Sequence, residues 1–207
     1  MAANIWDTVP VSRGGVVHDR PGTRPKRADA RRNAANLLDA ATAVFVESGV
    51  AAPIRDIAAR AGIGTATIYR HFPTRADLIV AVYRHQVETL AEAGPSLLAS
   101  SATPYAALAS WLDLFVDFVV TKQGLAKVLQ SDDPCYDPLH AYFLERLVPV
   151  CGALLDAGAA EIRSDVDPYE LMRGIGGLCA AAGGTLPYDE RRLVAILVAG
   201  LRSGESQ

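Results

Sequence analysis

The side chains best suited to a chemical task are the polar residues of the short segment Thr65–His71. Ala66 and Arg70 are four residues apart, which places them on one face of a helix, flanked by Thr67 and Tyr69. An outward-facing guanidinium can donate two parallel hydrogen bonds to O6 and N7 of guanine. This face contains no acidic side chain, which phosphates would repel. The pattern therefore permits contact with nucleic acid without proving it.

Two short helices around a glycine turn are predicted to position these side chains. Apolar residues at i, i+3, i+4 and i+7 give the first helix one inward face, formed by Ile54, Ile57, Ala58 and Ala61. Gly62 is expected to end this helix in the left-handed conformation, and Gly64 to precede the next one. In the second helix, Ile68 and Phe72 are one turn apart and are expected to point inward. The segment is therefore predicted to be a helix-turn-helix.

At these residues the chain resembles the TetR family of bacterial transcriptional regulators. The resemblance extends from Asn33 to Leu78 and is strongest in Ala61–Ile63, Thr67–Phe72 and Phe72–Leu78. Four positions depart from the family pattern: Ala52 and Pro53 replace frequent capping threonines, Gly64 replaces a serine, and Thr65 replaces a common lysine. The departures leave the fold prediction unchanged and leave the operator sequence open.

The resemblance and the helix geometry together give a set of candidate DNA contacts. Arg70 is the leading candidate for reading bases, and Arg55 is either a second base reader or a phosphate clamp. Shorter contacts are expected from Thr65, Ala66 and Tyr69. Backbone anchors implied by the family are Thr67, His71 and Arg75, although His71 could instead cap the helix end. Arg75 follows a predicted capping box, Thr74 with Asp77, at a helix N-terminus that favours phosphate.

The charge distribution agrees with a DNA-binding front and a different second part. The whole chain has a formal net charge of −3. Residues 13–75 contain eleven Lys and Arg against five Asp and Glu, whereas residues 76–207 contain nine against seventeen. A basic segment followed by an acidic one is expected of a protein that contacts phosphates with one domain only.

The predicted fold is all-α in three parts. Residues 1–27 form a flexible basic N-terminal arm, which either follows the DNA backbone or is a solvated tail. Residues 28–75 form a three-helix helix-turn-helix DNA-binding domain, with a first helix over 28–48. Residues 76–207 form a helical ligand-binding and dimerisation domain, with helices over 78–91, 105–121, 138–157 and 189–201 and another beginning at Pro168.

The resemblance implies a ligand cavity in the second domain. Its candidate wall residues are Trp111, Phe115, Phe118, Tyr142, Phe143 and Arg146. Taken one at a time, the aromatic residues among them are better explained as ordinary core, because pockets and cores use the same residue types. Arg146 would either extend to solvent or meet the polar end of a ligand. We therefore expect a small, mostly apolar effector with one polar end.

The resemblance also implies that the last two long helices pair with their counterparts in a second subunit. The run Gly174–Gly177 suggests close helix–helix approach rather than a nucleotide-binding loop, because it follows no predicted strand. A buried pair of helices within one chain would leave the same pattern. A two-fold dimer would present two recognition helices to successive major grooves, so the operator is expected to be palindromic.

Other chemistries find little support in the sequence. Asp113 and Asp117 share a helix face, but without an acid–base partner they are interpreted as a solvated stripe rather than paired catalytic carboxylates. The four histidines and three cysteines lack metal-ligand spacing, and no nucleophile or phosphate-loop motif is present. We therefore predict no metal, no cofactor and no enzymatic activity.

The expected setting is a reducing cytoplasm, because the odd cysteine count argues against a disulfide framework and the N-terminus lacks a signal-peptide pattern. The uncharged stretch Ala93–Leu112 contains Pro95 and Pro104, so a helix break is expected there instead of a membrane span. The resulting hypothesis is a homodimeric, ligand-responsive transcriptional regulator that acts as a repressor. The alternatives are an architectural DNA-binding protein without an effector and a helical enzyme.

Overall fold

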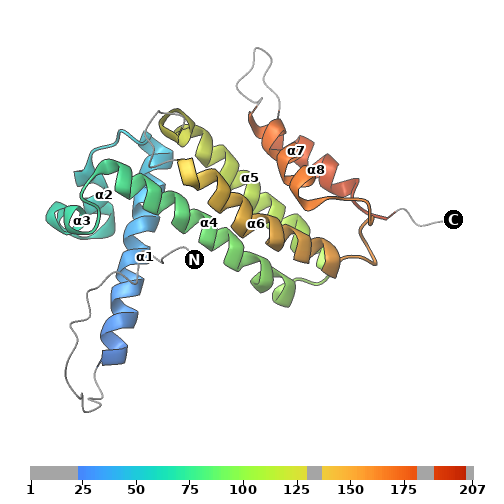
Figure 1. The fold of residues 1–207 in the computed structure, drawn as a ribbon, viewed down its shortest axis with the longest axis horizontal. Coiled ribbons are helices and arrows are strands. Elements are labelled where there is room, and N and C mark those ends of the chain that lie inside the picture. Colours follow the sequence, from blue (N-terminus) through green and yellow to red (C-terminus); the bar gives the residue numbers. More distant parts are fainter. Residues whose placement is uncertain (1–22, 130–136, 181–188, 204–207) are drawn as a thin grey trace. The chain divides into compact units, whose positions relative to one another are not determined.

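The computed structural model describes residues 23–129, 137–180 and 189–203 (Figure 1). In this described part the chain forms eight α-helices. They are α1 (Thr23–Ser48), α2 (Ile54–Ala61), α3 (Thr65–His71), α4 (Arg75–Ser100), α5 (Pro104–Leu129), α6 (Asp137–Ala157), α7 (Pro168–Ala180) and α8 (Glu190–Ala199). The predicted all-α fold is confirmed.

Local sequence explains one end of each of four helices. Gly62 has a φ of +67° and ends α2 in the left-handed conformation, which glycine adopts without steric cost. The Thr74 hydroxyl accepts a hydrogen bond from Asp77 N, and the Asp77 carboxylate accepts one from Thr74 N, completing the predicted capping box of α4. Asp167 and Asp189 accept backbone N–H hydrogen bonds at the starts of α7 and α8.

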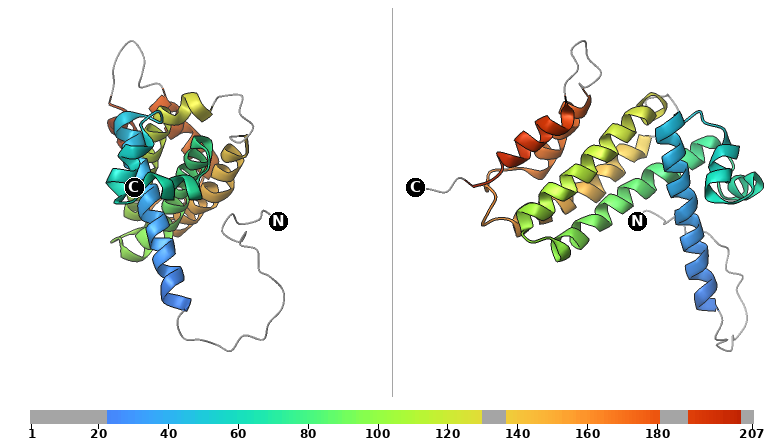
Figure 2. Two further views of the ribbon diagram at one scale, coloured as in Figure 1. Left: turned by 90° about the vertical axis from the view of Figure 1, so that its left-hand side faces the viewer. Right: turned by 180° about the vertical axis from the view of Figure 1, so that it is seen from behind.

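The residues from Ala35 onward form one compact unit, and the chain up to Ala34, including the first turns of α1, forms another. In the larger unit the long helices α4, α5 and α6 lie side by side, as Figures 1 and 2 show. A single cluster of buried apolar side chains runs through the unit from Leu37 to Leu201. Gly94 is buried where α4 meets α6, and a Cβ there would overlap the Val150 side chain. Glycine at this position therefore allows the two helices to approach closely.

Several predicted boundaries differ from the structure. The first helix begins at Thr23 instead of Ala28, so residues 23–27 of the predicted flexible arm are helical; the remainder of the arm lies outside the described residues. The fourth helix continues through Pro95 to Ser100, and the predicted break falls at 101–103, immediately before Pro104. The next helix extends eight residues beyond its predicted end, to Leu129. For α4, packing against α5 and α6 maintains the helix where local sequence favours interruption.

Candidate nucleic-acid interface

Helices α2 and α3 form the predicted helix-turn-helix. Ile57 and Ile68 are almost completely buried and anchor the inner sides of the two helices, and Phe72 is half-buried against the same core. Gly64 is in an extended conformation immediately before α3, and no side-chain hydrogen bond caps that helix. The two helices are therefore held by apolar burial and by the Gly62 turn.

The outward side of α3 has the composition expected from the sequence. Ala66 and Arg70 are both exposed, and Tyr69 retains 52% of its surface. Of the other candidate contacts on this helix, Thr65 and His71 are exposed and Thr67 is half-buried. The helix thus presents an exposed guanidinium and phenol, with no carboxylate among its residues. Such a surface can approach a phosphate backbone without charge repulsion.

The first turn of α2 adds a further exposed cation. The Arg55 side chain is 81% exposed and lies 3.5 Å from the Asp56 carboxylate, which is itself half-exposed. Arg60, at the end of the same helix, donates a hydrogen bond of 2.6 Å to Glu47 of α1, and this interaction raises the pKa of the guanidinium. Arg55 is therefore the more available of the two side chains for an external phosphate or base.

Arg75 has a different environment from the other candidate DNA contacts. Its guanidinium donates hydrogen bonds of 2.5 Å to Val50 O and 2.8 Å to Ala52 O, in the loop between α1 and α2. The side chain predicted to anchor DNA thus joins the beginning of α4 to the helix-turn-helix domain. Arg75 is predicted to contact a phosphate because it lies at a helix N-terminus, where backbone N–H groups favour an anion. The structure retains this position at the start of α4. The guanidinium itself is bound to the loop.

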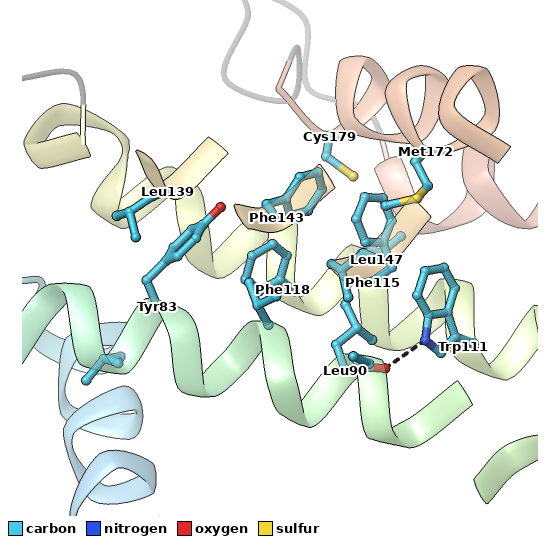
Figure 3. Packing of buried hydrophobic residues seen from close by; sticks show 14 of the residues in the cluster. Tyr83, Leu90, Trp111, Phe115, Phe118, Leu139, Phe143, Leu147, Met172 and Cys179 are labelled. Carbon is cyan, nitrogen blue, oxygen red and sulfur yellow. Dashed lines mark hydrogen bonds between the residues drawn. The ribbon is translucent and has the colours of Figure 1, made fainter. Parts of the chain in front are cut away.

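Four of the five predicted aromatic wall residues come together in the larger helical part, but they pack as core (Figure 3). Trp111, Phe115 and Phe118 of α5 are at most 6% exposed, and Phe143 of α6 is 8% exposed. Their ring centroids lie 5.8 to 6.5 Å apart in a continuous chain of contacts. The indole N–H of Trp111 donates to Leu90 O at 2.9 Å. In this structure the rings contact one another, as ordinary core residues do.

Tyr142 and Arg146 meet a partner that the sequence did not reveal. The Arg146 guanidinium donates two hydrogen bonds, 2.7 and 2.6 Å long, to the Glu88 carboxylate of α4. The Tyr142 hydroxyl donates to the same carboxylate. The hydrogen bonds from Arg146 lower the pKa of Glu88, and burial together with Glu88 raises the pKa of Tyr142 to about 12. Arg146 is thus neither extended freely into solvent nor without a counter-charge.

The paired carboxylates of α5 also have a partner. Arg191 of α8 donates to Asp113 at 2.9 Å and also to Asp117. The two carboxylates, one helical turn apart, therefore bind the guanidinium of an arginine more than seventy residues later in the sequence. We call this arrangement the Arg191 clasp. Both carboxylates remain more than half exposed, as expected of a solvated stripe, and Arg191 is the partner that the sequence did not reveal.

Helices α7 and α8 leave apolar and small residues exposed. Leu193, Ile196 and Leu197 of α8 are 37%, 61% and 37% exposed. At Gly174 and Gly177 of α7, an added Cβ would meet no described atom within 4 Å. The predicted close helix–helix approach at these glycines is therefore not found within the described part of this chain.

The remaining candidate chemistries can be tested only on the described residues. Cys151 and Cys179 are buried, and burial raises the pKa of the Cys151 thiol to about 12; Cys135 lies outside the described residues. Within the described ranges, no group of three or more His, Cys, Asp or Glu could hold a metal ion. No helix in those ranges is both long and apolar enough for a bilayer crossing.

Comparison with known proteins agrees with this arrangement. Residues 37–82 match the family described as bacterial regulatory proteins, tetR family, and residues 103–203 match the SbtR-like transcriptional regulator C-terminal domain. The crystal structure of the TetR transcriptional regulator SCO0520 from Streptomyces coelicolor is 34% identical, with a TM-score of 0.71, over 83% of this chain and 99% of that one. The chain belongs to the TetR family of bacterial regulatory proteins.

Two curated relatives match over shorter segments. The transcriptional activator FasR of Mycolicibacterium smegmatis is 33% identical over 116 residues, which are 55% of this chain and 52% of FasR. The transcriptional repressor Rv3405c of Mycobacterium tuberculosis is 44% identical over 69 residues, 32% of this chain and 37% of the repressor. The matched segments thus span about half the length of these curated relatives or less.

Proposed function

We propose that the protein is a DNA-binding transcriptional regulator whose helix α3 enters the major groove. The observation that supports this most directly is the division of α3 into two sides. Ile68 is buried at 1% exposure, while Ala66, Tyr69 and Arg70 face outward. A seven-residue helix with one anchored side can present its other side to base edges.

Within this proposal the exposed side chains have different tasks. Arg70 reads a guanine through O6 and N7, and Ala66 contacts a thymine methyl group. Thr65 and Tyr69 make shorter contacts. Arg55, Thr67 and His71 hold the phosphate backbone, since the exposed Arg55 lies at the edge of the motif on α2. At Arg75 the backbone N–H groups of the α4 N-terminus face the phosphate, while the guanidinium holds the α1–α2 loop.

We further propose that the protein is a homodimer formed through α7 and α8. The exposed Leu193, Ile196 and Leu197 supply an apolar surface, and the open glycines of α7 leave room for a helix of the second subunit. Two-fold symmetry would then place two copies of α3 about 34 Å apart, one duplex turn, on a palindromic operator.

The proposed regulation is repression in the cytoplasm that is relieved by a small, mostly apolar effector. The effector would occupy the region around Trp111, Phe115, Phe118 and Phe143 by separating their rings, with its polar end competing with Glu88 for Arg146. A ligand that binds the non-DNA-binding conformation more tightly releases DNA by shifting populations. Repression is the usual mode of the family, and one relative is described as a repressor and another as an activator.

Footprinting on captured genomic DNA tests this function. Purified protein is incubated with genomic fragments at low salt, and the bound fragments are sequenced and footprinted. We expect discrete protection of an inverted repeat whose half-sites are centred about one helical turn apart. Uniform coating would favour an architectural DNA-binding protein, and a complete lack of preference among fragments would refute the regulator.

A further inference from the structure

Helix α8 is attached to α5 near both of its ends. Near its beginning, Arg191 binds Asp113 and Asp117. Near its end, the Tyr105 hydroxyl donates to Val198 O at 3.1 Å, and the Arg202 guanidinium lies over the Tyr105 ring at 4.2 Å from its centroid. These polar contacts fix the separation of the two helices.

A half-open cavity of about 230 Å³ lies between these two attachments, with Ala195 at its solvent-exposed side. Its lining is formed by Tyr105, Ala109, Leu112, Asp113, Val116, Arg191, Val194, Ala195 and Val198. Most of these side chains are apolar, and two of them are alanines, which are short. Trp111 and Phe115 are absent from this lining, so the cavity is separate from the aromatic region proposed for the effector.

We infer that the α5–α8 cavity binds a small, uncharged, mostly apolar molecule, such as a short-chain alcohol or a phenol. An apolar cavity of about 150 Å³ can hold benzene, whereas drug-sized ligands occupy about 300–1,000 Å³. A volume of about 230 Å³ therefore fits a ligand of one ring or a short chain. The mostly apolar lining favours such a molecule because binding removes part of its surface from water.

The charged groups at the cavity determine the preferred polar end of the ligand. Asp113 and Arg191 already neutralise each other, with a hydrogen bond of 2.9 Å. A carboxylate ligand would have to displace Asp113 from Arg191, and an ammonium ligand would have to displace Arg191 from Asp113. A hydroxyl group can instead donate to a remaining lone pair of the Asp113 carboxylate, which has about four acceptor positions. An uncharged ligand thus keeps the Arg191 clasp intact.

Occupation of the cavity also has a consequence for α8. A ligand adds apolar contacts to the inner side of the helix, through Val194 and Val198, and so stabilises its packed position. The outer side of the same helix contains Ile196, which belongs to the proposed dimer surface. This coupling to dimer formation rests on the proposed function, whereas binding to the cavity does not.

The test uses the full chain with three probes of equal chain length: 1-hexanol, hexanoate and hexylammonium. Binding is measured by isothermal titration calorimetry and by the NMR shifts of labelled Val194 and Val198 methyl groups. We expect saturable binding of 1-hexanol, at least tenfold tighter than that of either charged probe. Hydrogen exchange of the α8 amides should slow when 1-hexanol is bound. Equal or tighter binding of a charged probe would overturn the ligand class.

Substitutions within and beside the cavity locate the binding. Ala109→Leu fills the cavity from α5 and should weaken 1-hexanol binding at least tenfold. Ser110→Leu introduces the same side chain at the next position, which is exposed and outside the lining, and should leave binding unchanged. If Ala109→Leu does not fold, Ala195→Leu is used in its place, because it fills the cavity from α8 and should also weaken 1-hexanol binding at least tenfold. Unchanged affinity in a folded filling variant, or no saturable binding to the wild type, would refute the site.

A monomeric variant separates this inference from the proposed function. Ile196→Glu changes the outer side of α8, outside the cavity lining. If it abolishes the dimer and still binds 1-hexanol, the cavity is supported independently. If the wild type forms no dimer and binds no palindrome, but 1-hexanol still binds and Ala109→Leu removes that binding, the proposed function fails and the cavity stands.

Discussion

The outer sides of α3 and α8 are both exposed, but they differ in chemistry. On α3 the exposed groups are a guanidinium, a phenol and an imidazole around the small Ala66. On α8 they are mainly the aliphatic side chains of Leu193, Ile196 and Leu197, with Arg192 one turn before Ile196. Polar groups lose little by remaining in water until DNA arrives, whereas a contiguous apolar surface favours burial against another protein. The contrast is the basis on which we propose DNA as the partner of α3 and a second subunit as the partner of α8.

The largest expected effect in this comparison is on the α8 side. Ile196→Glu would place an unpaired carboxylate in the proposed dimer interface, where desolvation of the charge is costly. We expect the dimer dissociation constant to rise at least a hundredfold, about 3 kcal/mol, in sedimentation equilibrium experiments. The affinity for the operator should fall as the dimer dissociates, because a monomer contacts only one half-site.

Ala153→Glu on the exposed side of α6 provides the matched control. It introduces the same charge outside α7 and α8, and the dimer should persist. Similar dissociation constants for the two variants would mean that the apolar side of α8 is ordinary exposed surface. The proposal that α8 binds a second subunit would then be wrong.

On the side of α3, the next effect concerns what holds the helix-turn-helix domain in place. Arg75→Ala removes both charge-assisted hydrogen bonds to the α1–α2 loop and leaves two half-buried carbonyl groups with poorer partners. The free energy of unfolding, measured in urea, should fall by about 1.5–3 kcal/mol. Arg55→Ala, which removes an 81% exposed arginine from the same domain, should change it by less than about 0.5 kcal/mol. Equal stability of the two variants would contradict a structural role for Arg75.

Arg70 is expected to show the opposite behaviour, because it is exposed and is assigned to base reading. Arg70→Ala should weaken operator binding by about 1–3 kcal/mol and relax sequence preference, with protein stability unchanged. Arg60→Ala removes the same charge from α2 and should weaken operator and random DNA to the same small extent. Competition gel shifts with both DNAs measure the difference. If Arg70→Ala also lowered both affinities equally, its side chain would contact only phosphates.

The two regions also differ in how much the sequence predicts. The turn at Gly62, the buried Ile68 and the Thr74–Asp77 capping box depend on residues a few positions apart, so local pattern is sufficient to place them. The partners of Arg146 and Arg191 lie 58 and at least 74 residues away in sequence. No local spacing indicates such pairs.

Composition has a similar limit in the aromatic cluster and along α4. Phe115 and Phe143 have the residue types of a pocket wall, yet their rings fill the space between α5 and α6. The fourth helix, predicted to end near Ala91, continues through Pro95 to Ser100, packed against α5 and α6. In both cases tertiary packing decides the outcome.

The smallest expected effect lies on α4, which joins the helix-turn-helix domain to the remaining helices. Glu88→Gln removes the carboxylate that Arg146 and Tyr142 share. The two charged side chains retain 34% and 44% exposure, so solvent weakens the pair and we expect a loss of about 0.5–1 kcal/mol at pH 7. Glu92 is exposed and lies one turn later on α4, and Glu92→Gln should lower the free energy of unfolding by less than Glu88→Gln does.

The pH dependence of this difference gives the more specific test. Because the folded protein lowers the pKa of Glu88 below its ordinary value of 4.5, the stabilisation is fully present above that value. It is lost as the pH falls through the lower pKa of the folded state. Urea unfolding of wild type and Glu88→Gln should therefore differ at pH 7 and converge as the pH falls below about 4.5. A difference that persisted unchanged in acid would arise from packing, and α4 would then join the two domains without any contribution from the charge of Glu88.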